Sequence, residues 1–385
     1  MALFKKGTTL LALAGTLLFV GLFIFRVKGE MADFEVNYRA GNRLWQGETL
    51  YRTADEHYQF KYSPASALLY LPLSALPLTA AKAVWYVLIL VSIFASFYFS
   101  SKLADSSGGK GLTAVLISGA ILARFFFREL QLGQINALIM ALLVLMIWML
   151  ARVSPGMAIR RETWAGFLWG LATALKPYAL IFFPYFLIKK KWRSLWPGLV
   201  LIAFSLFVPM IFYGLGGNMI VLREWVSSLS RSTPALLTSQ DNVSLLAGLS
   251  KWTGQSDFAL LLYAIGLGIL TFSTLLIIRR GKKVAVPLVL DGALLLVLIP
   301  LVSPLGWDYT FLSSILAVAL VVRDFSLFPK GIKVILAVNF LIVGLAIYDL
   351  WGRNLYAAFM SLSVPTINFL ILIAGLFYLR AKGRR

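Results

Sequence analysis

The feature that most constrains this chain is a series of long apolar runs, separated by short polar or charged segments. Hydrophobic residues make up 60% of the sequence and charged residues only 14%, whereas a soluble domain carries roughly 25% charged residues. A run of about 20 apolar residues is long enough to cross the hydrocarbon core of a bilayer as a helix. The sequence therefore predicts an all-α polytopic membrane protein and excludes a soluble globular fold.

Apolar runs of spanning length recur along the whole chain. They lie at residues 8–25, 83–101, 112–127, 135–151, 195–213, 258–278, 284–301, 309–322, 332–348 and 363–379. A further run at 163–191 carries cations at both ends, but it is too short to cross a core of about 30 Å twice at about 1.5 Å per residue. Because Lys176-Pro177 interrupts this run, we expect a broken hairpin of two short helices. Counted this way, residues 1–385 form a single transmembrane domain of about 12 helices.

The distribution of cations indicates how the chain is oriented. The net charge is +20, which in a soluble protein would suggest nucleic acid, but here the cations cluster between apolar runs, as the positive-inside rule expects. We therefore expect no nucleic-acid partner. Lys5 and Lys6 precede the first run, and no small-residue cleavage motif follows it, so we expect an uncleaved first span rather than a signal peptide. Both termini then lie in the cytoplasm, and segments 27–64 and 214–257 face the exterior of the cell (inner) membrane.

Several kinds of chemistry are absent from the sequence. There is no cysteine, which excludes disulfides and thiolate metal sites. No Walker or Rossmann glycine pattern indicates a nucleotide site, and no acidic cluster has the spacing of divalent-metal ligands. We therefore expect neither a cofactor nor a metal.

The first exterior segment, 27–64, holds the leading candidate for a catalytic group. Asp33 follows the first apolar run closely, so its carboxylate is expected at the level of the lipid headgroups. A carboxylate in such a place can act as a general base toward a hydroxyl group, although an ordinary surface or helix-capping aspartate is the alternative. Asp55 and Glu56 look like part of a solvated turn.

Charged residues at the membrane boundary or inside it are candidates for binding a lipid phosphate. Arg124 and Arg128 share a helix face by their spacing, and arginine pairs with phosphate through two hydrogen bonds. Lys176 is embedded beside a helix break, where an ammonium must meet an acid, a carbonyl array or an anionic ligand. Snorkelling, pairing of Arg128 with Glu129, and a structural salt bridge of Lys176 remain the alternatives. For Asp291, inside its run, we expect a pairing within the bundle.

Neutral polar and aromatic residues on the same outer face are candidates for binding the sugar or the acceptor. Gln134 and Asn136 open the run at 135–151, and Asn242 lies in the second exterior segment. Trp307 and Asp308 lie between two runs, in SPLGWDYT. A tryptophan of the interfacial aromatic belt is the alternative for Trp307.

Six segments, taken in order along the chain, resemble glycosyltransferase family 87, the polyprenyl-phosphate-mannose-dependent membrane transferases of the GT-C superfamily. They are DFEVNYRAGNRLWQGETLY, YSPASALLYLPLSALP, LGQINALI, AGFLWGLATALKP, DNVSLLAGL and SPLGWDYT. Each segment alone is only weakly specific for the family, whereas the six segments in this order are fairly specific for it. The last two apolar runs carry no such segment.

The resemblance implies a GT-C-type bundle whose exterior loops form the active-site face. It implies that Asp33 is the general base. It also implies a donor cavity lined by Lys176, Gln134 and Asn136. Family members often carry one or two histidines just after the tryptophan of an SP-x-x-W motif, but here Trp307 is followed by Asp308. A histidine role at that position is therefore either absent or taken over by Asp308.

The function implied by the resemblance is a glycosyl transfer. Mannose, or another hexose or pentose, would move from a polyprenyl-phosphate donor to a hydroxyl of a glycolipid or glycan. Asp33 would take the proton from the acceptor hydroxyl, which attacks the anomeric carbon with inversion. The embedded cations would stabilise the departing polyprenyl phosphate. The alternatives are a lipid-linked glycan flippase or transporter, and a polymer transferase of the O-antigen-ligase type.

Overall fold

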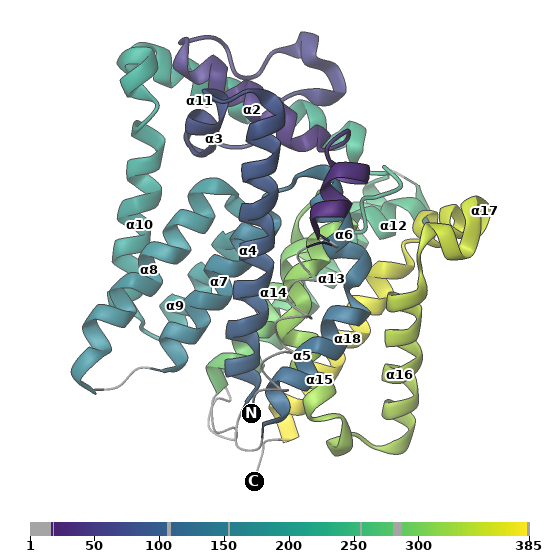
Figure 1. Ribbon diagram of the computed structural model, residues 1–385. Coiled ribbons are helices and arrows are strands. Elements are labelled where there is room, and N and C mark those ends of the chain that lie inside the picture. The colour runs from purple at the N-terminus through teal and green to yellow at the C-terminus, as the bar shows by residue number, and fades with distance from the viewer. Residues whose placement is uncertain are drawn as a thin grey trace, which may run out of the picture.

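The computed structural model describes residues 17–382, except 18, 106–108, 153–154, 255 and 280–286. Within this part the regular elements are helices. In addition, Asn242 and Trp307 form one isolated antiparallel β-bridge. Upright helices form the body of the molecule, and further helices lie across its upper end (Figure 1). This architecture confirms the predicted all-α polytopic class. Most of the first apolar run, 8–25, lies outside the described residues.

Three described helices are long and apolar enough to cross a membrane by length and composition. They are α4 (Leu78–Ala104), α13 (Asp257–Arg279) and α18 (Val364–Lys382). The helices α7 (Asn136–Ala151) and α14 (Pro287–Val302) are also apolar but shorter. All five coincide with predicted runs. The count of about twelve spans stays a prediction, since these criteria give three spans in the described part, or six with the bent pairs described next.

Three predicted spans bend sharply near one end, which we did not expect. The angles are 64° between α5 (Lys110–Ile121) and α6 (Ala123–Leu132), 85° between α10 (Trp192–Phe207) and α11 (Met210–Leu236), and 107° between α16 (Lys330–Leu345) and α17 (Tyr348–Ser361). The expected span at 309–322 also differs, because it begins as a 3₁₀ helix, η6 (Asp308–Ser314), before α15 (Ile315–Arg323). The bends turn α11 and α17 across the upper end of the molecule (Figure 1).

The helices across the upper end, together with nearby loops, form what we call the outer layer. It contains α2 (Ala32–Trp45), η2 (Thr53–Tyr58), η3 (Pro64–Ser66), α3 (Ala67–Ser74), α11, α12 (Leu245–Thr253) and α17. The short remaining elements are η1 (Phe23–Val27), η4 (Pro155–Met157) and η7 (Phe325–Leu327). Large apolar side chains are exposed on both bent helices of this layer, among them Ile211 and Leu215 on α11 and Leu350 and Leu355 on α17.

The broken hairpin predicted at 163–191 is present. α8 (Ala158–Leu175) ends where Lys176 adopts extended backbone angles, φ −149° and ψ 113°, and η5 (Pro177–Phe182) and α9 (Phe183–Ile188) follow. Lys191 Nζ lies 2.7 Å from Glu162 Oε1, so the two ends of the hairpin meet at one end of the bundle. The break therefore places Lys176 inside the bundle, as expected.

The pairing expected for Asp291 is also confirmed. The carboxylate of this fully buried residue accepts a hydrogen bond of 2.8 Å from Arg380 Nε and lies 3.9 Å from Lys189 Nζ. Arg380 belongs to the last turns of α18, and Lys189 follows α9 directly. The C-terminal end of α18 therefore lies beside the cationic end of the hairpin.

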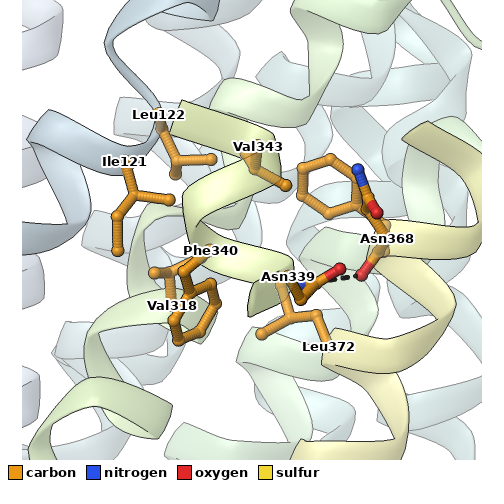
Figure 2. A pocket seen from close by; sticks show the side chains of 9 residues that line it. Ile121, Leu122, Val318, Asn339, Phe340, Val343, Asn368 and Leu372 are labelled. Carbon is orange, nitrogen blue, oxygen red and sulfur yellow. Dashed lines mark hydrogen bonds between the residues drawn. The ribbon is translucent and has the colours of Figure 1, made fainter. Parts of the chain in front are cut away.

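A small gap remains in the packing between α5, α15, α16 and α18. Figure 2 shows that its lining is apolar except for Asn339 and Asn368, where Asn339 Nδ2 donates a hydrogen bond of 3.2 Å to the Asn368 carbonyl. The gap has no room for a water-sized molecule. It is therefore a feature of helix packing and not a ligand site.

Candidate active site

The start of α2 is fixed against the end of α6, and this contact places Asp33. Met31, just before α2, has a left-handed backbone with φ 61°, and its N–H donates a hydrogen bond of 2.8 Å to the Gln131 carbonyl. Left-handed φ values are uncommon for residues other than glycine, so a tertiary contact must hold this one. Asp33 lies in the first turn of α2. Its position is thus tied to α6.

The turn between α6 and α7 needs a glycine at Gly133. Its φ is +69°, and a Cβ there would lie only 2.7 Å from Phe34 Cβ. Glycine meets both requirements, since it tolerates this φ and allows the close approach of α2. Trp85 Nε1 donates to the Gly133 carbonyl at 2.8 Å and holds the turn in place. The following residue, Gln134, is thereby brought against α2.

Gln134 connects Asp33 to two tyrosines. Its Nε2 donates to Asp33 Oδ2 at 2.6 Å and to the Tyr309 hydroxyl at 3.2 Å. Its Oε1 accepts a hydrogen bond of 2.9 Å from the Tyr62 hydroxyl. Because the two ends of the amide have different partners, its orientation is fixed. The sequence singled out Asp33 and Gln134 but not Tyr62, and it placed Tyr309 in the candidate segment SPLGWDYT without giving it a role of its own.

Lys176 lies next to this network. Its Nζ donates to Asn136 Oδ1 at 2.7 Å and lies 5.2 Å from the ring centroids of both Tyr62 and Tyr178. Aromatic faces attract a cation at this distance. Tyr62 contacts both Gln134 and Lys176, so the candidate base and the embedded cation belong to one site.

A residue that sequence reasoning did not assign to the site, Glu129, lies beneath Asn136. Its side chain is fully buried, with Oε2 accepting from Asn136 Nδ2 at 2.9 Å and Oε1 accepting from the Ala137 N–H at 2.7 Å. We considered a pairing with Arg128, but Arg128 instead donates to Gln131 Oε1 at 3.0 Å. Neighbouring helical residues face different directions, which was the available signal against that pairing.

The two arginines expected at the donor phosphate lie opposite carboxylates. Arg124 Nη1 is 3.7 Å from Asp308 Oδ2, and Arg128 Nη2 is 3.9 Å from Asp241 Oδ2. Arg124 also donates at 3.2 Å to the hydroxyl of Tyr356 on α17. The predicted shared helix face of the arginines is consistent with these positions, since the Asp308 N–H donates to the Asp241 carbonyl at 3.0 Å. Among the contacts of the described residues, none joins either arginine to Lys176.

Asn242 has a different environment from the one expected of a sugar ligand. It is fully buried, its Nδ2 donates at 3.1 Å to the Pro304 carbonyl, and its Oδ1 accepts at 2.9 Å from the Gly306 N–H. It thereby clamps segment 214–257 to the loop that carries Trp307. Direct contact with a substrate would require this buried amide to give up backbone partners. The Trp307 ring is half-buried and stacks on Tyr309, with centroids 6.5 Å apart.

Two lysines of the outer layer lie near acids of the site. Burial lowers the pKa of Lys61, and the charge of Asp33 opposes this shift. Burial lowers the pKa of Lys251 to about 8, while Asp241 and Asp308 act in the opposite direction. Both lysines add positive potential to the outer end of the site.

Other acids of the first exterior segment are paired away from the site. Asp55 forms a salt bridge with Arg43, so it is not simply part of a solvated turn. The Arg43 guanidinium lowers the pKa of the Asp55 carboxyl below its ordinary value. Glu35 lies 2.7 Å from the buried Lys82. Among the described residues, no group of three His, Cys, Asp or Glu side chains is placed to hold a metal ion.

Comparison with known proteins identifies the family. The model of glycosyltransferase family 87 matches residues 60–304, more than half of the chain. This range includes Gln134, Asn136 and Lys176 but not Asp33 or Asp308. An alpha-(1->3)-arabinofuranosyltransferase of Corynebacterium glutamicum is 24% identical over 265 residues, which cover 64% of this chain and 58% of that protein. No solved structure matches. The resemblance stated above is thus confirmed, and the chain belongs to glycosyltransferase family 87.

Proposed function

We propose that this membrane glycosyltransferase moves a sugar from a polyprenyl-phosphate donor to a hydroxyl of a glycolipid or glycan, with Asp33 as the general base. The observation that carries the proposal is the connection of Asp33 to Lys176 through Gln134 and Tyr62. A carboxylate for the proton and an embedded cation for the phosphate are the two groups that this reaction requires.

The reaction is a single displacement. The acceptor O–H gives its proton to Asp33 as its oxygen bonds to the anomeric carbon, and the bond from that carbon to the phosphate oxygen breaks. The electron pair of the broken bond leaves with the polyprenyl phosphate. Attack from the face opposite the phosphate inverts the anomeric configuration. Gln134 holds the Asp33 carboxylate in place, and Lys176 opposes the charge of the leaving phosphate.

The pairing of Arg124 with Asp308 has a supporting role in this proposal. Asp308 stands where family members often carry a histidine, and its partner is Arg124. Since Tyr309 follows directly and reaches Gln134, this pair would fix the loop that completes the site. The half-buried Trp307, stacked on Tyr309, offers an apolar ring face to a sugar or an acceptor. Arg128 is more accessible, with 42% of its side chain exposed, and can meet an anionic headgroup.

The sugar is the least constrained part of the proposal. The Corynebacterium relative is named as an arabinofuranosyltransferase, so a pentofuranose donor has to be tested beside mannose. The orientation that we propose keeps the cationic hairpin end and the end of α18 in the cytoplasm and the outer layer outside. Reporter fusions after Gly109 and within residues 53–57 test this orientation, and they should report the cytoplasm and the exterior respectively.

A transfer assay with purified protein in liposomes tests the function. Polyprenyl-phosphate donors with radiolabelled arabinofuranose or mannose are supplied with a cell-envelope glycolipid fraction, and a nucleotide sugar serves as the comparison donor. We expect transfer from a lipid donor only, undiminished by EDTA, with inverted configuration in the product. Movement of the donor between leaflets without transfer would favour a flippase. Transfer of whole glycans in place of single sugars would favour a polymer transferase.

A further inference from the structure

Glu129 is the most deeply buried charge near the site, and the reaction described above does not use it. Its side chain has no exposed surface, although a carboxylate away from water is costly unless its oxygens are bonded. Both oxygens do accept hydrogen bonds, from Asn136 Nδ2 and the Ala137 N–H. Neither of these donors is a cation. Burying a carboxylate costs free energy, and only Asn136 separates this one from Lys176. A function of Glu129 beside Lys176 would account for this burial.

The contact with Glu129 determines which way the Asn136 amide points. An amide has a donor end and an acceptor end of nearly equal shape. With Nδ2 on the carboxylate, Oδ1 faces Lys176 Nζ at 2.7 Å and the Tyr178 hydroxyl at 3.2 Å. The reversed amide would set its carbonyl against the carboxylate and its NH₂ against the ammonium. The reversed orientation of the amide is therefore disfavoured by both the carboxylate and the ammonium.

The result is an ammonium that is held without being neutralised by contact. An ammonium carries three N–H groups, and the described contacts of Lys176 use one of them, toward Asn136. The Tyr62 and Tyr178 rings flank the nitrogen and restrict where it can move. Glu129 supplies a negative charge near the Lys176 ammonium, but the Asn136 amide stands between the two groups and keeps them out of direct contact. A carboxylate in direct contact would occupy the N–H groups that a phosphate requires.

We propose that Glu129 is a positioning residue, which acts through Asn136 to hold the Lys176 ammonium for the phosphate of the lipid donor. This inference rests on the proposed function, because it takes Lys176 as the ligand of that phosphate. Glu129 does not touch the donor. Its effect is on where the cation is held, and therefore on donor affinity more than on the bond-breaking step.

A double-mutant cycle separates this role from a structural one. Steady-state kinetics in liposomes, with the polyprenyl-phosphate donor varied, are measured for Glu129→Gln, Lys176→Met and the double variant. We expect each single variant to raise the donor KM about tenfold or more. The kcat of Glu129→Gln should change less than about threefold, whereas Lys176→Met should also lower kcat, because its ammonium opposes the charge of the leaving phosphate. The double variant should be no worse than Lys176→Met alone, since residues acting as one unit are not additive. Glu162→Gln, at a largely buried glutamate that pairs with Lys191 where the two ends of the hairpin meet, is the matched control and should leave donor KM unchanged.

The possible results are distinguishable. If Lys176→Met leaves the donor KM unchanged, the proposed donor site is wrong, and this inference falls with it. If Lys176→Met raises the donor KM but Glu129→Gln does not, or if the two effects multiply, only the role of Glu129 is wrong. Should Glu129→Gln fail to fold, as judged by melting in detergent, Asn136→Leu replaces it in the same cycle. Multiplying effects of Asn136→Leu and Lys176→Met would equally overturn the inference.

Discussion

Two charged groups lie beneath the helices of the outer layer, and they are built differently. We call the first the amide-linked group, which consists of Asp33, Glu129, Gln134, Asn136 and Lys176. We call the second the ion-paired group, which consists of Arg124, Arg128, Asp241 and Asp308. In the amide-linked group a neutral amide stands between Glu129 and Lys176, and another amide bonds Asp33. In the ion-paired group each arginine lies opposite a carboxylate, at 3.7 and 3.9 Å.

The difference teaches how a buried charge can be kept for chemistry. Opposite charges in contact satisfy each other, and such pairs mainly fix structure. A charge that meets its counter-charge through an amide, as Lys176 meets Glu129 through Asn136, is stabilised but keeps hydrogen-bonding capacity for a ligand. We therefore expect the amide-linked group to control activity and the ion-paired group to control stability. Each of the following predictions tests this division.

The largest effect is expected for Asp33→Asn. The amide cannot accept the acceptor proton, and loss of a general base typically lowers the rate about 10²- to 10⁴-fold. The melting temperature should stay close to that of the wild type. Asp349→Asn, at an exposed position of α17, is the control, because Glu35 contacts the buried Lys82 and is less suitable. An active Asp33→Asn beside an inactive Asp308→Asn would reverse the assignment of the two groups.

Removing Arg124 should reduce stability. Arg124→Met leaves the Asp308 carboxylate buried opposite an apolar side chain, and breaking such a pair typically costs about 3–5 kcal/mol. We expect a lower denaturation midpoint in detergent. In the double variant Arg124→Met with Asp308→Asn, much of this loss should be recovered, because no buried charge is left without a partner. A stable but inactive Arg124→Met would place Arg124 in the catalytic group instead.

The two cations proposed at the donor phosphate should differ in importance. Lys176→Met is expected to raise the donor KM about tenfold or more, since a desolvated cation opposite a phosphate contributes on the order of 2 kcal/mol. Arg128→Gln should change the donor KM less than about threefold, because this half-exposed arginine lies opposite Asp241. Equal effects of both variants would mean that the donor phosphate also contacts the ion-paired group.

The smallest effect is expected for the outer-layer pair Arg43–Asp55. The folded pKa of Asp55 is lowered, so the contribution of the pair is present above the ordinary aspartate pKa near 3.9 and is lost as the pH falls through the lowered value. Arg43→Gln should therefore lower the free energy of unfolding at pH 7 by about 1 kcal/mol. The difference from wild type should shrink below about pH 4. A difference that does not depend on pH would mean that Arg43 acts through packing alone.

Several parts of the fold could be predicted because a local cause decided them. The break at Lys176 follows from the proline beside it, and the pairing of Asp291 follows from the cost of a charge in an apolar helix. The bend before α11 lies at Pro209, so a proline signal was present there too, although we did not expect a bend. The bend before α17 has no such signal and depends on how the helix packs against its neighbours. The expected span at 309–322 was wrong in its first half for the same reason.

The candidate site could be predicted only in part. Asp33, Lys176, Gln134 and Asn136 stood out because polar groups in an apolar chain need a reason to be there. Glu129 also stood out, but its neighbour Arg128 offered an easier partner than Asn136, which lies beyond the turn at Gly133. Tyr62 could not be singled out, because nothing in the sequence separates a tyrosine of the site from one of the apolar core. Tyr309 lay in the candidate segment SPLGWDYT, but no role of its own followed from the sequence.

The apolar side chains exposed on the bent helices have a consequence for how substrates arrive. Exposed apolar side chains lie on both sides of the kink at Gly214 in α11, as Ile211 and Leu215, and of the kink at Gly352 in α17, as Leu350 and Leu355. Such side chains suit segments that rest in the headgroup region and reach into the acyl chains. The entrance to the site would then open within the leaflet, and a lipid-linked donor would reach it by lateral diffusion. Its effective concentration is a number per unit of membrane area. We therefore expect the reaction rate to follow the mole fraction of donor in the bilayer, and to stay constant when the vesicle suspension is diluted with buffer.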